Sequence, residues 1–115
     1  MRAGISALVQ YATAVLLVFI VSWHMALRFP PIYGVEDFPA TLMPEVLYRE
    51  ISGNWLLLSL LLVATILHGI NGIRTILLEW NTSKSWSLAV NAAAVIAAVV
   101  LSAFGIHTII AVVPP

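Results

Sequence analysis

The chain has 115 residues, of which 62% are hydrophobic and 9% are charged, and its formal net charge is zero. A soluble domain is about 45–50% apolar and about 25% charged, and a small one buries little of its surface, so lipid is the expected solvent. The balanced charge offers no basic surface for nucleic acid, and the absence of cysteine excludes disulfides, thiolate zinc sites and thiolate-bound iron–sulfur clusters.

The first apolar run predicts a transmembrane helix over about residues 4–27. No fixed charge lies between Arg2 and Arg28, and a spanning helix needs roughly 20 mostly apolar residues. The run is longer than the apolar part of a cleaved signal peptide, and no small-residue cleavage site follows it, so we expect it to be retained. Pro30 and Pro31 end the helix, because proline cannot continue its hydrogen-bond ladder.

A long, proline-rich connection over residues 28–52 precedes two further spans. Pro44 is placed to begin a short surface helix, "PEVLYREI". Apolar runs then predict spanning helices over about residues 53–79 and 86–112, which the short connection "NTSKS" makes antiparallel neighbours. The chain, residues 1–115, is thus expected to be one all-α domain, a bundle of three transmembrane helices.

The third span carries stripes of small residues at four-residue spacing, which let helix backbones approach closely. The stripes either pack within this chain or contact another subunit; they consist of Ala89, Ala93 and Ala97, and of Ala94, Ala98 and Ser102.

Basic residues that flank the spans favour an orientation, because they are retained on the cytoplasmic side. Arg2, Arg74 and Lys84 fall on one side, and Arg28 and Arg49 on the other. This excess predicts that the N-terminus lies inside and the C-terminus outside. We expect the chain to be an integral protein of a prokaryotic cytoplasmic membrane.

Ionisable residues inside a span are functional candidates. With about 100° between successive residues, His68 and Gly72 lie about 40° apart on the second span. Glu79 returns to within about 20° of His68 and lies about 16 Å further along the axis. Arg74 points about 120° away, and its long stem is expected to reach the headgroups.

His68 and Gly72 together are compatible with axial haem ligation. A flat macrocycle bound to His68 would lie against the helix, where a bulky side chain at position 72 would collide with it. As a ligand, His68 should hydrogen-bond a second group through its other ring nitrogen. The alternative is a histidine that is only packed and hydrogen-bonded.

The remaining histidines and the aromatic residues at the helix ends have simpler interpretations. His24 and His107 fall towards the outer side, where they form a second haem site, bind lipid or only lie at the interface. Amphipathic rings prefer the membrane interface, which is the expected place of Trp23, Tyr33, Trp55, Trp80 and Trp86.

The stretch "LHGINGIRTILLEW" resembles the second helix of the membrane-anchor subunits of succinate dehydrogenase and fumarate reductase. In that family the helix reads His-x-x-x-Gly, often followed by Ile-Arg, with an acidic residue eleven positions after the histidine and often an aromatic next. The end of the first span, "SWHMALRF", is similar to that of short three-helix anchors. The length of the chain and its long first loop also agree with such anchors, so the resemblance covers essentially the whole chain.

The resemblance implies a function for the pattern. A second three-helix anchor would pair with this chain and share a b-type haem with it, and His68 would ligate the iron. A flavoprotein and an iron–sulfur subunit would dock on the inner face and pass electrons from succinate to a quinone. Glu79 and Trp80 would border the quinone site, and Arg74 is a candidate contact for a haem propionate.

Three departures from the family's pattern concern the quinone site. Trp80 stands where tyrosine is common, although an indole N–H is also a donor, and Glu79 replaces the usual aspartate. The first helix of many such anchors carries Arg-x-Ser/Thr-Gly, whereas residues 11–14 here read "YATA", in which Thr13 alone fits. We therefore expect the partner anchor to supply most of the quinone contacts.

Three alternatives remain open for the function. The first is a cytochrome b subunit of another membrane oxidoreductase, and the second is a haem-free scaffold in which His68 is only packed. The third is a small transporter, although the first span lacks the embedded carboxylate that small transporters usually carry there.

Overall fold

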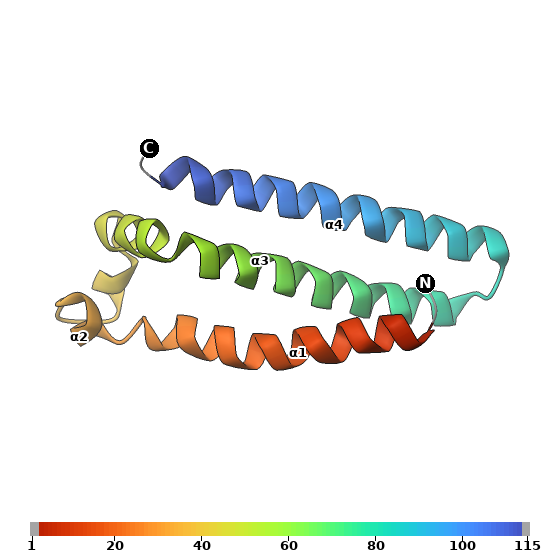
Figure 1. Ribbon diagram of the computed structural model, residues 1–115, viewed down its shortest axis with the longest axis horizontal. Helices are drawn as coiled ribbons and strands as arrows, with labels where there is room; N and C mark the ends of the chain where they lie inside the picture. The colour runs from red at the N-terminus through yellow and green to blue at the C-terminus, as the bar shows by residue number, and fades with distance from the viewer. Residues whose placement is uncertain (1–2, 114–115) are drawn as a thin grey trace.

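The computed structural model describes residues 3–113, and Arg2, which entered the charge count above, lies outside this range. Four α-helices and one 3-10 helix follow one another (Figure 1): α1 Ala3–Ala26, α2 Pro30–Tyr33, η1 Pro39–Leu42, α3 Pro44–Trp80 and α4 Lys84–Val112. Helices α1, α3 and α4 are each long and apolar enough to cross a membrane. The expected all-α fold with three spanning helices is confirmed.

Helix α3 consists of a surface segment and a spanning segment that meet at Asn54. Asn54 has non-helical backbone angles, φ −127° and ψ 22°, which place a kink directly after Gly53. The expected surface helix does begin at Pro44, with Glu45 in its first turn. The connection expected over residues 28–52 therefore contains α2, η1 and the first part of α3.

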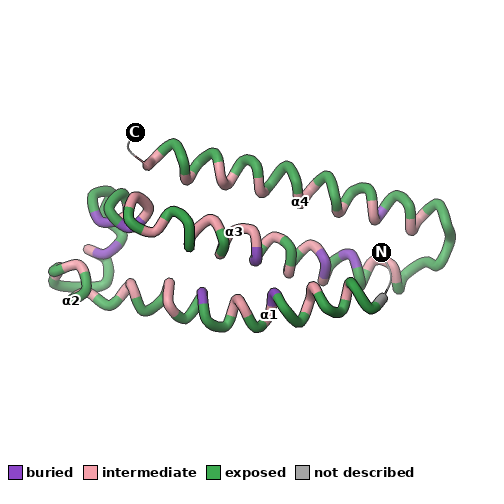
Figure 2. Tube along the Cα trace, in the orientation of Figure 1, coloured by how far each residue is buried: buried purple, intermediate pink, exposed green. Residues whose placement is uncertain are grey.

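The three long helices lie side by side, with α3 in the middle (Figure 1). Helix α3 packs against both α1 and α4. The buried residues lie along these two seams and in the outer connection, where Thr41, Val46 and Glu50 are buried, and the outer sides of α1 and α4 are largely exposed (Figure 2). Such apolar, exposed helix sides suit lipid or a partner subunit.

Helix α1 presents one narrow face to α3. Its inward residues recur at intervals of three and four, as expected for antiparallel helix packing, and four of them carry polar side chains. They are Ser6, Gln10, Thr13, Leu17, Ile20 and His24, of which Thr13 and Ile20 are buried.

The connection between α3 and α4 is fixed by side chains at both sides of the turn. The Trp86 indole Nε1 donates to the Leu77 carbonyl at 2.7 Å, and Ser83 Oγ accepts from the Trp86 backbone N–H at 3.3 Å. The first bond satisfies a carbonyl in the last turn of α3, and the second caps α4. Trp86, expected as an interface aromatic, therefore also joins the two helices.

The small residues of α4 partly face α3. Ala94, Ala98 and Ser102 are half-buried, whereas Ala89 and Ala93 are exposed. Gly105 lies so close to α3 that an added Cβ would overlap the side chain of Leu62. Packing within the chain thus accounts for the stripe of Ala94, Ala98 and Ser102. It leaves Ala89 and Ala93 of the other stripe exposed.

Candidate functional site

His68 lies at the α1–α3 seam, with Thr13 as its closest polar neighbour. The His68 Nδ1 atom is 3.1 Å from Thr13 Oγ1, and Thr13 Oγ1 donates its own hydrogen to the Val9 carbonyl at 2.6 Å. Because that hydroxyl hydrogen is engaged, the oxygen accepts from His68, which places the ring proton on Nδ1. The Nε2 atom then carries a lone pair.

Gln10 and Gly72 border the Nε2 side of the His68 ring. Gln10 Nε2 is 3.5 Å from His68 Nε2, a long contact, and its Oε1 accepts from Asn71 Nδ2 at 2.9 Å. A Cβ added at Gly72 would lie 3.4 Å from the Gln10 amide nitrogen. His68 and Gly72 therefore share a face, as the helix geometry predicts, and that face meets α1.

Arg74 corrects an expectation, because its side chain is buried rather than extended to the headgroups. The residue is 9% exposed, and its Nε donates to Asn91 Oδ1 of α4 at 2.6 Å. Its Nη1 lies 3.3 Å from Ser6 Oγ of α1 and 3.5 Å from Asn71 Oδ1. Helix α4 supplies an acceptor on the side of α3 away from His68, so the guanidinium joins all three spans.

A groove opens between the first turns of α1 and the last turns of α3. Its volume is about 480 Å³, and it is lined by Ser6, Ala7, Gln10, Tyr11, Arg74, Thr75, Leu78 and Glu79. Glu79 is exposed, and its neighbour Trp80 is 73% exposed and lies outside the lining. Of the two residues expected to border a quinone, the groove includes Glu79.

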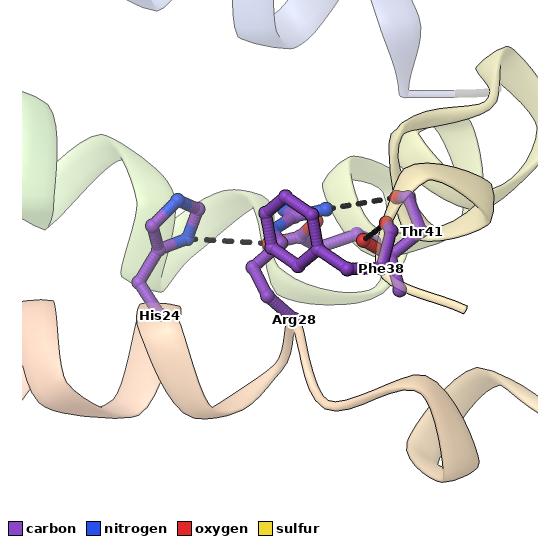
Figure 3. Close-up of polar contacts among 5 residues, drawn as sticks. His24, Arg28, Phe38 and Thr41 are labelled. Atoms are coloured by element: carbon purple, nitrogen blue, oxygen red, sulfur yellow. Dashed lines mark hydrogen bonds and ion pairs between the residues drawn. The ribbon is translucent and has the colours of Figure 1, made fainter.

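A second polar cluster lies at the opposite end of the helices and includes His24, Arg28 and Thr41 (Figure 3). Its centre is the carboxylate of Glu50, which is buried. Arg28 forms an ion pair with Glu50 and donates through Nη1 to the Thr41 carbonyl at 3.0 Å. His24 Nδ1 lies 3.2 Å from Glu50 Oε1. The cluster joins the end of α1 to η1 and to the surface segment of α3.

Tyr33 and Arg49 extend this cluster along the outer connection. The Arg49 guanidinium lies 5.5 Å from the centre of the Tyr33 ring, and its Nη2 donates to the Tyr33 carbonyl at 3.3 Å. Burial raises the pKa of the Tyr33 phenol above its usual value, and the charge of Glu50 adds to this effect. A neutral phenol is thus favoured beside the surface helix.

His24 and His107 have different surroundings. His24 belongs to the Glu50 cluster, whereas His107 is exposed on α4. Within residues 3–113 no group of three or more histidine and acidic side chains is arranged to hold a metal ion. This observation does not bear on a haem shared with another subunit, which would take a single histidine from this chain.

Single-helix geometry missed Thr13 as the partner of His68 and Asn91 and Ser6 as partners of Arg74, because these residues lie on neighbouring helices. Thr13 was singled out only through the resemblance. The spacing of Ser6, Gln10 and Thr13 on one face of α1 is a signal that polar groups meet at the first seam. Asn91, a lone amide in an apolar run, is the corresponding signal for α4.

Comparison with known families finds a match that covers most of the chain. Residues 4–101 match the family described as succinate dehydrogenase/fumarate reductase transmembrane subunit. No curated protein and no solved structure matches the chain.

Proposed function

This chain belongs to the succinate dehydrogenase/fumarate reductase transmembrane subunit family, and we propose that it holds a b-type haem through His68 and borders the quinone site. As an integral membrane subunit of this family, it associates with the other subunits of such an enzyme. We propose that these are a second membrane anchor, an iron–sulfur subunit and a flavoprotein. Electrons from succinate would then reach a quinone at the membrane.

The contact between Thr13 and His68 carries the haem proposal. Axial ligation needs an unprotonated ring nitrogen, and a ligand histidine usually donates its other N–H to a second group. Thr13 Oγ1 accepts that N–H, since its own hydrogen is used by the Val9 carbonyl. Nε2 is thereby left as the nitrogen for iron, with the long Gln10 contact beside it.

Gly72 leaves room for a macrocycle on the His68 face, because it adds no side chain one turn from His68. The Gln10 side chain borders Nε2 and would have to give up its hydrogen bond with Asn71 when a haem binds there. A haem held here would supply one-electron iron chemistry. His68 and a histidine of the partner anchor would hold its iron.

Arg74 remains our candidate for a haem propionate contact. No carboxylate lies within ion-pair distance of Arg74 in the part of the chain that the structure describes. Asn91, Ser6 and Asn71 surround it with neutral acceptors. A buried guanidinium held only by neutral groups favours an anion from outside the chain.

Glu79 and Trp80 are proposed to border the quinone at the inner end of α3. Glu79 places an acceptor in the groove there, and Trp80 offers a large exposed ring beside it. We place this end of the molecule, with the N-terminus and Lys84, on the cytoplasmic side. Impermeant maleimide labelling of single cysteines at Lys84 and Glu36 tests the orientation, because only Glu36→Cys should react from outside.

Reduced-minus-oxidised spectra of the complex, purified with its natural partners, test the haem proposal in wild type and in two variants. The reduced-minus-oxidised spectrum should contain a b-type α-band that His68→Ala removes and His107→Ala, on the exposed side of α4, retains. An α-band that survives in His68→Ala would refute ligation by His68. A complex without haem would identify the chain as a haem-free scaffold.

Co-purified subunits test the family function separately. A flavoprotein and an iron–sulfur protein should accompany the chain. Their replacement by a different oxidoreductase would instead identify a cytochrome b subunit of another enzyme.

A further inference from the structure

The groove between α1 and α3 has polar side chains that fall into two groups. Ser6 and Arg74 are hydrogen-bonded to each other and to Asn71, and the Thr75 hydroxyl donates to the Asn71 carbonyl at 2.8 Å. Gln10 also contacts Asn71. Ser6, Gln10 and Arg74 are therefore occupied in holding the helices together, and the Thr75 hydroxyl is satisfied within α3.

Tyr11 and Glu79 form the second group. Both line the groove from opposite helices, both are exposed, and neither makes a side-chain hydrogen bond within residues 3–113. The Tyr11 phenol is a donor and Glu79 is an acceptor when ionised. A side chain on a helix leans towards the N-terminus, so Tyr11 leans along α1 towards the level of Ser6 and the groove.

We propose that Tyr11 is the hydrogen-bond donor from this chain to a carbonyl oxygen of the quinone. The inference rests on the proposed function and makes it specific. A quinone is a flat ring with two acceptor oxygens, and the phenol of Tyr11 gives it both a donor and an aromatic face. Glu79 lines the same groove from α3, while Trp80 is 73% exposed and lies outside the lining.

The size and the walls of the groove suit a ring with an apolar tail. Its volume of about 480 Å³ lies within the range of about 300–1,000 Å³ that small-molecule sites occupy. Ala7 and Leu78 supply the apolar walls. The groove is not enclosed, so an apolar tail of the quinone could extend out of it.

Steady-state kinetics of the intact complex test the role of Tyr11. Tyr11→Phe should raise the KM for a short-chain quinone about three- to tenfold, which is the effect of losing one neutral hydrogen bond. Tyr48→Phe, on the exposed surface segment of α3, is the matched control and should leave KM unchanged. Trp80→Phe should change KM less than Tyr11→Phe does.

A second assay separates failure of this inference from failure of the proposed function. Succinate oxidation by a soluble dye that bypasses the membrane subunits should be the same in wild type and Tyr11→Phe. An unchanged quinone KM in Tyr11→Phe, or a larger increase in Trp80→Phe, would overturn the role of Tyr11. Loss of bound phospholipid from Tyr11→Phe without a change in KM would assign the groove to lipid. That result would also overturn the role of Tyr11 in quinone binding. Wild-type complex that oxidises succinate but never reduces quinone would instead refute the proposed function.

Discussion

The Thr13 hydroxyl oxygen lies 3.1 Å from Nδ1 of His68, so one side chain of α1 sets the tautomer of the histidine on α3. Thr13→Val keeps the shape but removes the acceptor. We expect the affinity of the complex for haem to fall about 10- to 100-fold, the usual effect of losing the group that orients a metal ligand. Haem transfer to a scavenging apoprotein, followed by the α-band, measures this affinity.

Two further variants provide the controls. Thr13→Ser retains the hydroxyl and should restore most of the affinity. Thr65→Val removes a hydroxyl that donates to the Leu61 carbonyl of its own helix, at 2.7 Å, and should leave haem binding unchanged. Equal haem retention in wild type and Thr13→Val would show that Thr13 does not orient the ligand.

Asn91 is expected to stabilise the chain through its contact with Arg74. Asn91→Leu removes the acceptor of a 2.6 Å bond from a buried cation and should lower the free energy of unfolding by about 1.5–3 kcal/mol. Unfolding in mixed micelles with increasing denaturing detergent measures the change. The cost should largely disappear in an Arg74→Met background, since no charged donor is then left unpaired, and the same loss in both backgrounds would contradict the pairing.

Gly105 should be intolerant of even a single methyl group. A Cβ at this position would overlap Leu62, whose Cγ would lie 3.2 Å away, so Gly105→Ala must displace α4 or force Leu62 into a new rotamer. We expect a loss of stability of about 1–3 kcal/mol. Gly69→Ala has no atom within 4 Å of its new Cβ and should be neutral or stabilising, by up to about 1 kcal/mol. The same micelle unfolding assay compares Gly105→Ala with Gly69→Ala. Equal stability of the two variants would argue against close α3–α4 packing.

The Glu50 carboxylate should hold the surface segment of α3 against α1. The chain has no cysteine, so a cysteine introduced at the buried Val46 is a unique reporter of its opening. Glu50→Gln leaves Arg28 without its ion-pair partner and should speed maleimide labelling of Val46→Cys about tenfold. Glu45→Gln, on the exposed start of the same helix, should not. Equally slow labelling of Val46→Cys in the Glu50→Gln and Glu45→Gln variants would show that apolar contacts alone hold the segment.

The sequence predicted the helices well because lipid leaves little choice. Uncharged runs of this length must be helical to satisfy their backbone groups, and Pro30 and Pro44 set boundaries that follow directly from proline chemistry. The common face of His68 and Gly72 followed from helix periodicity alone. Each of these features can be predicted from the sequence of a single helix, without knowing which helix packs against it.

What the sequence did not predict depends on which helix meets which. The burial of Arg74 needs Asn91 from another helix, and the pairing of His24 with Glu50 needs the fold of the outer connection. Helical periodicity gives the direction of a side chain but not its neighbour. The interfacial position expected of Trp86 was compatible with its bond to Leu77, but did not predict it.

The contacts of Arg74 have a consequence for the order in which the chain is made. Synthesis proceeds from the N-terminus, so Ser6 and Asn71 precede Arg74, while Asn91 follows it by 17 residues. Until the last span enters the bilayer, the guanidinium lacks its shortest hydrogen bond. Insertion of the last span therefore completes the solvation of a charge that is already in the membrane, which gives the third helix a reason to dock promptly against the other two.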